Sequence, residues 1–232
     1  MSDVPRIVLV GATGLIGRRV IEAASTDDGV RLIGLARREA PLPKGARMEM
    51  VVADPPQWGE VMAALRPRAL ICALGTTWKK AGREEAAFRA VDHDLVLASA
   101  AAALKAGATN MVVVSASGAD RHSKSRYMRI KGEVESALSS MGFKRLDILH
   151  PGLLRGPRPD DWRLAERAAL LAAPLTDLML RGSWRRFGSI DARDVAAAAL
   201  GLAVRAAPGR FIHDNDAMRR AARERARTKG NG

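Results

Sequence analysis

The sequence is poor in two residue types that often build reactive sites. Among its 232 residues it has one cysteine, Cys72, and one tyrosine, Tyr127. A lone cysteine excludes a disulfide within the chain and argues against a metal site built from cysteines. The four histidines are not spaced as metal ligands, so no metal is expected.

Long hydrophobic runs are also missing. No uninterrupted apolar stretch reaches the ~18 residues that suggest a transmembrane helix, so no membrane span is expected. The opening residues, MSDVPRIVLV, lack a basic segment followed by a long apolar one, which argues against a secretory signal. These absences predict a cytoplasmic protein.

Acidic residues are scarce relative to basic ones. The 25 acidic side chains face 38 lysines and arginines, which gives a formal net charge of +13. Part of the excess lies in residues 213–232, which we expect to form a basic, flexible C-terminal tail. A contact for an anionic partner is the alternative for this tail. A nucleic-acid partner is not expected, because zinc-finger spacing and a pair of aromatics on a strand are both missing.

Short apolar runs alternate with amphipathic helical patterns. The runs that predict strands are 6–10, 31–36, 48–53, 69–74, 110–115 and 146–150. Helical patterns cover 15–24, 58–65, 83–106, 125–141 and 194–204. This alternation predicts an α/β fold with a Rossmann-type, doubly wound parallel sheet and helices on both faces. We expect residues 1–212 to form one domain, with a small C-terminal substrate cap at about 153–189.

A glycine-rich turn joins the first predicted strand to the first predicted helix. Its residues are Gly11, Ala12, Thr13, Gly14, Leu15, Ile16 and Gly17. The first glycine permits a tight turn, the second lets the backbone approach a pyrophosphate, and the third lets helix pack on strand. The free N–H groups of the helix start favour an anion. The turn therefore predicts binding of a nicotinamide dinucleotide.

Two arginines follow the second predicted strand, where NAD-binding proteins often carry an acid. An acid at that place binds a free ribose 2′-hydroxyl, whereas arginine accommodates a 2′-phosphate. Arg37 and Arg38 occupy it here, and guanidinium suits phosphate well. The pattern predicts NADP(H) in preference to NAD(H), with a merely solvated arginine pair as the alternative.

The only tyrosine lies four residues before a lysine on one predicted helix. Tyr127 and Lys131 share a helix face at this spacing, and Ser115 ends the preceding strand. A phenol, whose ordinary pKa is about 10, is shifted toward phenolate by a nearby ammonium. The trio predicts acid/base chemistry on a small-molecule carbonyl or hydroxyl, with Ser115 holding the oxygen. An interfacial tyrosine beside a surface lysine is the alternative.

Six segments resemble the short-chain dehydrogenase/reductase superfamily, in its extended and atypical branches. They are VLVGATGLIGRRV at 8–20, ALGTTWKKAG at 73–82, FRAVDHDLVLASAAAALKAGA at 88–108, VVSASGAD at 113–120, YMRIKGEVE at 127–135 and HPGLLRGPR at 150–158. Within the superfamily, the sequence looks most like the atypical group that includes the oxidoreductase called Tat-interacting protein.

The resemblance implies further cofactor contacts. Asp54 should lie near the adenine, and Ala73, Leu74 and Gly75 should line the adenosine-to-nicotinamide stretch. Residues behind the nicotinamide should be Pro151, Gly152, Leu153 and Leu154. Asp92 falls where many relatives have an active-site asparagine, which puts a proton relay through that position in doubt.

Two functions remain open from the sequence. The first is an NADP(H)-dependent oxidoreductase in which Tyr127, Lys131 and Ser115 act on a carbonyl or secondary alcohol. The second is a non-catalytic NADP(H)-binding regulator or redox-sensing scaffold that recognises a protein partner, since several atypical members have such roles. A homodimer is compatible with either function.

Overall fold

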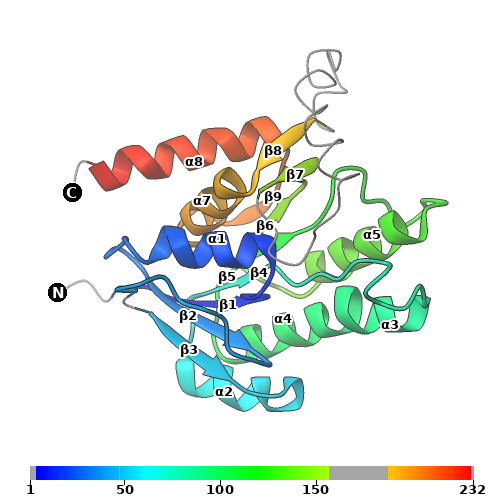
Figure 1. Ribbon diagram of the computed structural model, residues 1–232, viewed down its shortest axis with the longest axis horizontal. Helices are drawn as coiled ribbons and strands as arrows, with labels where there is room; N and C mark the ends of the chain where they lie inside the picture. Colours follow the sequence, from blue (N-terminus) through cyan, green and yellow to red (C-terminus); the bar gives the residue numbers. More distant parts are fainter. Residues whose placement is uncertain (1–3, 47, 157–187, 231–232) are drawn as a thin grey trace.

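The computed structural model describes residues 4–46, 48–156 and 188–230 (Figure 1). Its centre is a seven-stranded sheet in which every neighbouring pair is parallel. The strands are β1 (Arg6–Val10), β2 (Arg31–Ala36), β3 (Glu49–Val52), β4 (Ala69–Cys72), β5 (Asn110–Val114), β6 (Arg145–Leu149) and β9 (Gly209–His213). Their order is β3-β2-β1-β4-β5-β6-β9. The predicted doubly wound α/β fold is confirmed.

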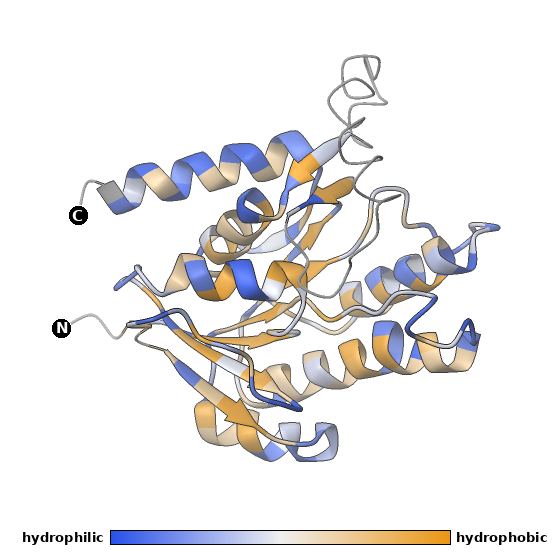
Figure 2. Ribbon diagram, in the orientation of Figure 1, coloured by the Kyte–Doolittle hydropathy of each residue, from blue (hydrophilic) through white to orange (hydrophobic). Residues whose placement is uncertain are grey.

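Helices cover both faces of the sheet, as Figure 1 shows. One apolar layer joins α1 (Leu15–Ala24), α7 (Ala192–Ala203) and α8 (Asn215–Gly230) to the sheet through Ile7 and Leu9 of β1. The opposite layer joins α2 (Trp58–Leu65), α4 (Leu95–Lys105) and α5 (Arg126–Ser139) through Val8 and Val10. Because both faces of β1 are buried, the strand is apolar at each of these four positions, and hydrophobic colour gathers along the central strands in Figure 2.

The long helical pattern at 83–106 is divided in the structure. It comprises α3 (Glu85–Arg89), a π-helical segment η2 (Ala90–Asp94) and α4. A π-helical turn holds an extra residue, so it changes which side chains face inward. Within η2 this brings Asp92 to a buried position between the sheet edge and α5.

A second, two-stranded parallel sheet pairs β7 (Leu153–Arg155) with β8 (Ser189–Asp191). Asn215 binds the backbone just before each of these two strands. Its Oδ1 accepts a hydrogen bond from Gly152 N at 3.0 Å, and its Nδ2 donates to Gly188 O at 2.8 Å. Most of the predicted cap at 153–189 lies outside the described residues.

The expectation of a flexible tail at 213–232 is wrong for most of that segment. His213 ends β9, and Asn215–Gly230 forms the helix α8, which packs against α7. Met218, Ala221 and Ala222 are buried, and they form an apolar stripe at helical spacing. Burial of this stripe outweighs the repulsion among the basic residues on the other face.

Candidate functional site

The glycine turn lies at the carboxyl end of β1, directly against the end of β4. Gly11 has a φ of +86°, and a Cβ on it would lie 2.4 Å from the carbonyl of Ala73. A Cβ on Gly17 would lie 2.2 Å from the carbonyl oxygen of Gly11. Neither position leaves room for a side chain, so α1 starts very close to the sheet. This is the close packing that a pyrophosphate-binding turn requires.

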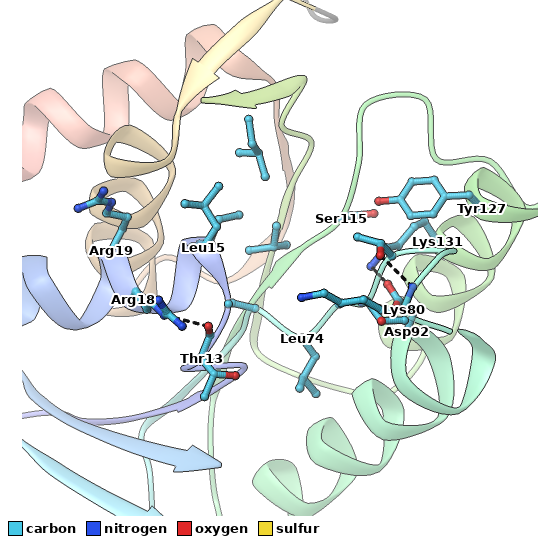
Figure 3. Close-up of a pocket in the computed structure, with 18 of the residues that line it drawn as sticks. Thr13, Leu15, Arg18, Arg19, Leu74, Lys80, Asp92, Ser115, Tyr127 and Lys131 are labelled. Carbon is cyan, nitrogen blue, oxygen red and sulfur yellow. Dashed lines mark hydrogen bonds and ion pairs between the residues drawn. The ribbon is translucent and has the colours of Figure 1, made fainter. Parts of the chain in front are cut away.

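Two adjoining cavities open in front of this turn. The larger cavity, about 730 Å³, is shown in Figure 3. Its walls include the predicted site residues Thr13, Gly14, Leu15, Ile16, Ala73, Leu74, Gly75, Ser115, Tyr127, Lys131 and Leu154. The smaller cavity, about 500 Å³, includes Gly11, Thr13, Gly14, Arg37, Arg38, Ala73, Leu74 and Gly75. The turn and the chain after β4 therefore belong to both cavities, and Tyr127 faces the larger one.

Five predicted cofactor residues do not line either cavity among the described residues. Gly17 packs helix on strand, as above. Exposed Asp54 caps the short 3-10 helix η1 (Pro55–Gln57) in a capping box with Gln57. Pro151 is buried, Gly152 is bound to Asn215, and Leu153 is half exposed in β7. Of the stretch expected behind the nicotinamide, the structure brings only Leu154 to a cavity wall.

Positive charge surrounds the cavities. Arg37 and Arg38 are exposed after β2, and neither side chain has a hydrogen bond or ion pair to another described residue. Lys80, in the loop after β4, lines both cavities and extends into the larger one in Figure 3. Arg18 is held by its own turn, since its Nε donates to Thr13 O at 3.0 Å. Three cations thus remain available to an anionic ligand without breaking an ion pair among the described residues.

Helix α5 supplies the tyrosine and the lysine. Tyr127 packs edge-on against Phe88, with ring centres 5.7 Å apart, and Lys131 Nζ lies 6.0 Å from the centre of the tyrosine ring. Figure 3 shows Tyr127, Lys131 and Ser115 together on one side of the larger cavity, opposite the glycine turn. The structure therefore brings together the three residues that the sequence suggested for acid/base chemistry.

The charge of Lys131 is directed to Asp92. Nζ lies 2.8 Å from Asp92 Oδ1, and the backbone N–H of Thr76 donates to Oδ2 at 2.7 Å. Both charged side chains are almost fully buried. Burial lowers the pKa of Lys131, but the carboxylate of Asp92, together with Tyr127 and Cys72, raises it by more, so that pKa lies above its ordinary value.

Tyr127 differs from expectation in its protonation. Burial raises its pKa, Lys131 lowers it, and Asp92 raises it, so the net direction is upward. The sequence argument had predicted a lowered pKa. That argument counted cationic neighbours and did not include the burial of the phenol, which is the largest cause, or the carboxylate of Asp92.

Ser115 is held by Glu135, which also contacts His150. Its hydroxyl donates to Glu135 Oε1, and His150 Nε2 lies 2.8 Å from the same oxygen. Ser117 instead donates to the carbonyl of His150 at 2.9 Å. Ser115 is therefore the serine that reaches the larger cavity, and its proton is shared with Glu135.

Sequence reasoning missed Glu135 and the pairing of Asp92 with Lys131. The helix spacing contained one signal, because Tyr127, Lys131 and Glu135 follow each other at intervals of four on α5.

The described residues contain no group of three or more potential metal ligands. In the same residues, no helix has both the length and the hydropathy of a membrane span.

Comparison with known proteins also indicates binding of a nicotinamide dinucleotide. The NAD(P)H-binding family pattern matches residues 11–203. A relative named "Protein fmp52, mitochondrial" from Emericella nidulans is 36% identical over 170 residues, covering 70% of this chain and 72% of the relative. The protein of the same name from Aspergillus clavatus is 32% identical over 213 residues, covering 88% of each chain.

Two solved structures with the same fold are named for a nucleotide sugar and NAD. MoeE5 in complex with UDP-glucose and NAD has a TM-score of 0.66 at 15% identity, covering 97% of this chain and 82% of that one. A Thermus thermophilus UDP-glucose 4-epimerase complex with NAD has a TM-score of 0.65 at 20% identity, covering 97% and 83%.

The predicted cytoplasmic location is wrong by these comparisons, because the curated relatives are named as mitochondrial proteins. The absence of a recognisable targeting segment was too weak an argument for a location. The relatives also carry the fmp52 name rather than that of the Tat-interacting group. The chain belongs to the NAD(P)H-binding family, and it shares its Rossmann-type fold with MoeE5 and the UDP-glucose 4-epimerase.

Proposed function

We propose that this protein is an NADP(H)-dependent oxidoreductase that acts on a carbonyl or secondary alcohol. The observation that carries the proposal is the larger cavity, where the glycine turn faces Tyr127 across one continuous space. A dinucleotide seated on the turn and a substrate beside Tyr127 would therefore meet. The match to the NAD(P)H-binding family over residues 11–203 supports the same class of cofactor.

The residues around the cavity fit the dinucleotide. Gly14, the N-cap of α1, has no side chain to cover the start of the helix, where free N–H groups would attract a pyrophosphate. The dinucleotide held there would supply hydride chemistry for the substrate carbon. Tyr127 would exchange a proton with the substrate oxygen. Ser115, whose own proton goes to Glu135, would accept a hydrogen bond from the hydroxyl of an alcohol substrate.

The preference for NADP(H) rests on Arg37 and Arg38. Their side chains line the smaller cavity and have no acidic partner among the described residues, so both charges are available to a 2′-phosphate. Calorimetric titration of NADPH and NADH into the wild type and Arg37→Ala/Arg38→Ala tests this. We expect NADPH affinity to fall to that of NADH in the variant.

A matched control is Arg220→Ala/Arg223→Ala, which removes two exposed arginines from α8. The control should bind both cofactors as the wild type does. Equal affinity of the wild type for NADPH and NADH would refute the preference, and no binding of either would refute the proposed function.

The catalytic assignment is tested by Tyr127→Phe. The wild type should turn over NADPH with members of a panel of aldehydes and ketones, or NADP⁺ with secondary alcohols. The variant should bind the cofactor equally well and lose turnover. Turnover that survives the change would remove Tyr127 from the mechanism.

A non-catalytic NADP(H)-binding regulator is the second candidate. Two observations favour it: the raised pKa of Tyr127 makes the phenol a weaker acid, and the Ser115 proton is committed to Glu135 and so cannot hold a carbonyl oxygen. This candidate predicts cofactor affinity without turnover over the whole panel. It also predicts a protein partner, or self-association, whose affinity changes when NADPH is added.

A further inference from the structure

Beside Tyr127, the ammonium of Lys131 is paired with the carboxylate of Asp92, and the proposed reaction does not require this pair. Lys131 Nζ lies 6.0 Å from the centre of the Tyr127 ring, yet it makes a 2.8 Å contact with Asp92 Oδ1. Asp92 is 1% exposed, and Lys131 is 5% exposed. Water therefore does not screen either charge well, and each acts strongly on its neighbours.

The backbone holds Asp92 in this place. The π-helical segment η2 lies between α3 and α4, and Asp92 is its only buried residue. The second carboxylate oxygen accepts the backbone N–H of Thr76, in the loop after β4. Two elements distant in the sequence thus fix the carboxylate, so the ion pair is part of the scaffold rather than a chance surface contact.

We infer that Asp92 is a positioning residue that binds the ammonium of Lys131 and withholds its positive charge from Tyr127, which keeps Tyr127 in its phenol form. The inference rests on the proposed function in one respect, since it gives that site a direction. A phenol donates a hydrogen bond and a proton, whereas a phenolate accepts them. The site is thereby suited to a ligand that presents an acceptor oxygen, such as a carbonyl.

Ser115 complements this arrangement. Because its hydroxyl donates to Glu135, it offers only acceptor lone pairs to the cavity. Tyr127 then is the proton donor of the pair, and a carbonyl oxygen is bound through Tyr127 rather than through Ser115. The direction of the raised pKa of Tyr127 agrees with this geometry.

Other titratable or charged groups lie near Tyr127 and Lys131, but none of those named here takes the place of Asp92 as the ion-pair partner of Lys131. They are Cys72 at the end of β4, Lys80 in the loop after it, Glu135 on α5 with His150 behind it, and Arg126 on α5, which faces Trp78. Burial raises the pKa of Cys72 to about 11, so this thiol is neutral at physiological pH. Glu135 has His150 as its own partner. Asp92 is the carboxylate that contacts Lys131.

The test uses the full-length protein without cofactor or substrate. Tyr127 is the only tyrosine, so the near-ultraviolet absorbance of phenolate reports its ionisation directly. Removing the carboxylate charge in Asp92→Asn should move the titration midpoint to lower pH and raise the phenolate fraction several-fold at a fixed alkaline pH. Asp94→Asn is the matched control, because Asp94 belongs to the same π-helical segment but is exposed and contacts His93. It should titrate as the wild type.

Two further variants keep the test decisive if Asp92→Asn does not fold. Lys131→Gln should raise the midpoint, and Lys131→Gln/Asp92→Asn should bring it back toward that of the wild type. An unchanged midpoint in folded Asp92→Asn overturns the inference, and so do equal midpoints in Lys131→Gln and the double variant. The result is independent of turnover, so a failed proposed function would appear separately, as an inactive wild type with the Asp92-dependent midpoint intact.

Discussion

Replacing Lys131 by methionine should destabilise the fold as well as impair the site. The substitution leaves the carboxylate of Asp92 in the interior without its partner, with that side chain 1% exposed. Breaking a buried ion pair by removing one partner costs about 3–5 kcal/mol. The hydrogen bond from Thr76 N remains, so we expect the lower end of that range, about 3 kcal/mol. Urea unfolding of the two proteins at neutral pH measures the difference.

The partner substitution separates charge from packing. Lys131→Met/Asp92→Leu replaces the pair by apolar side chains, and such replacements are often neutral or stabilising. The double variant should therefore recover most of the lost free energy of unfolding. Arg31→Met is the exposed control, because Arg31 and Glu49 are both more than half exposed and their pair should contribute less than about 1 kcal/mol. A Lys131→Met cost as small as that of the control would refute the reasoning. Loss of activity in a Lys131 variant should accordingly be interpreted only after its stability is known.

Three other substitutions test separate parts of the site. Gly17→Ala should lower the free energy of unfolding by about 1–3 kcal/mol and weaken NADPH binding, because the new Cβ would meet the carbonyl of Gly11. Thermal unfolding measures the loss, with Gly59→Ala as the control, since a Cβ there meets nothing within 4 Å. Lys80→Ala should weaken NADPH binding in calorimetry, whereas Lys79→Ala, an exposed lysine on neither cavity wall, should not; equal losses would contradict the role of the cavity. Burial raises the pKa of Cys72 from 9.0 to about 11. The stability that the neutral thiol contributes is therefore complete below pH 9.0 and is lost as the pH rises through about 11. Urea unfolding across that range should show a fall in the free energy of unfolding that Cys72→Ala lacks.

The parts that sequence predicted well are those with a local cause. β1 and β2 begin and end where the apolar runs begin and end, because strands buried on both faces must be apolar throughout. The glycine turn is similarly local, since its spacing reflects contacts between a strand and the helix that follows it directly. The shared helix face of Tyr127 and Lys131 also follows from spacing alone.

The parts that it missed depend on distant contacts. The π-helical turn in the pattern at 83–106 is tied to an ion pair with Lys131 and a hydrogen bond from Thr76, and neither partner is close in sequence to Asp92. For α8, the sequence does contain a helical pattern, but the excess of basic residues suggested a flexible tail instead. The stripe of Met218, Ala221 and Ala222 has helical spacing, but the surrounding arginines suggested a solvated tail. Arg225 in fact pairs with Asp27, which ties the helix back to the turn after α1.

The pairing of β7 with β8 has a consequence for how proteins of this fold diversify. Arg155 lies opposite Asp191, and Asn215 holds the backbone at Gly152 and at Gly188, so two points far apart in the chain are fixed side by side. The entropic cost of closing a loop between fixed ends grows only slowly with its length. The chain between these points can therefore be lengthened, shortened or exchanged during evolution at little cost to the sheet or to the glycine turn.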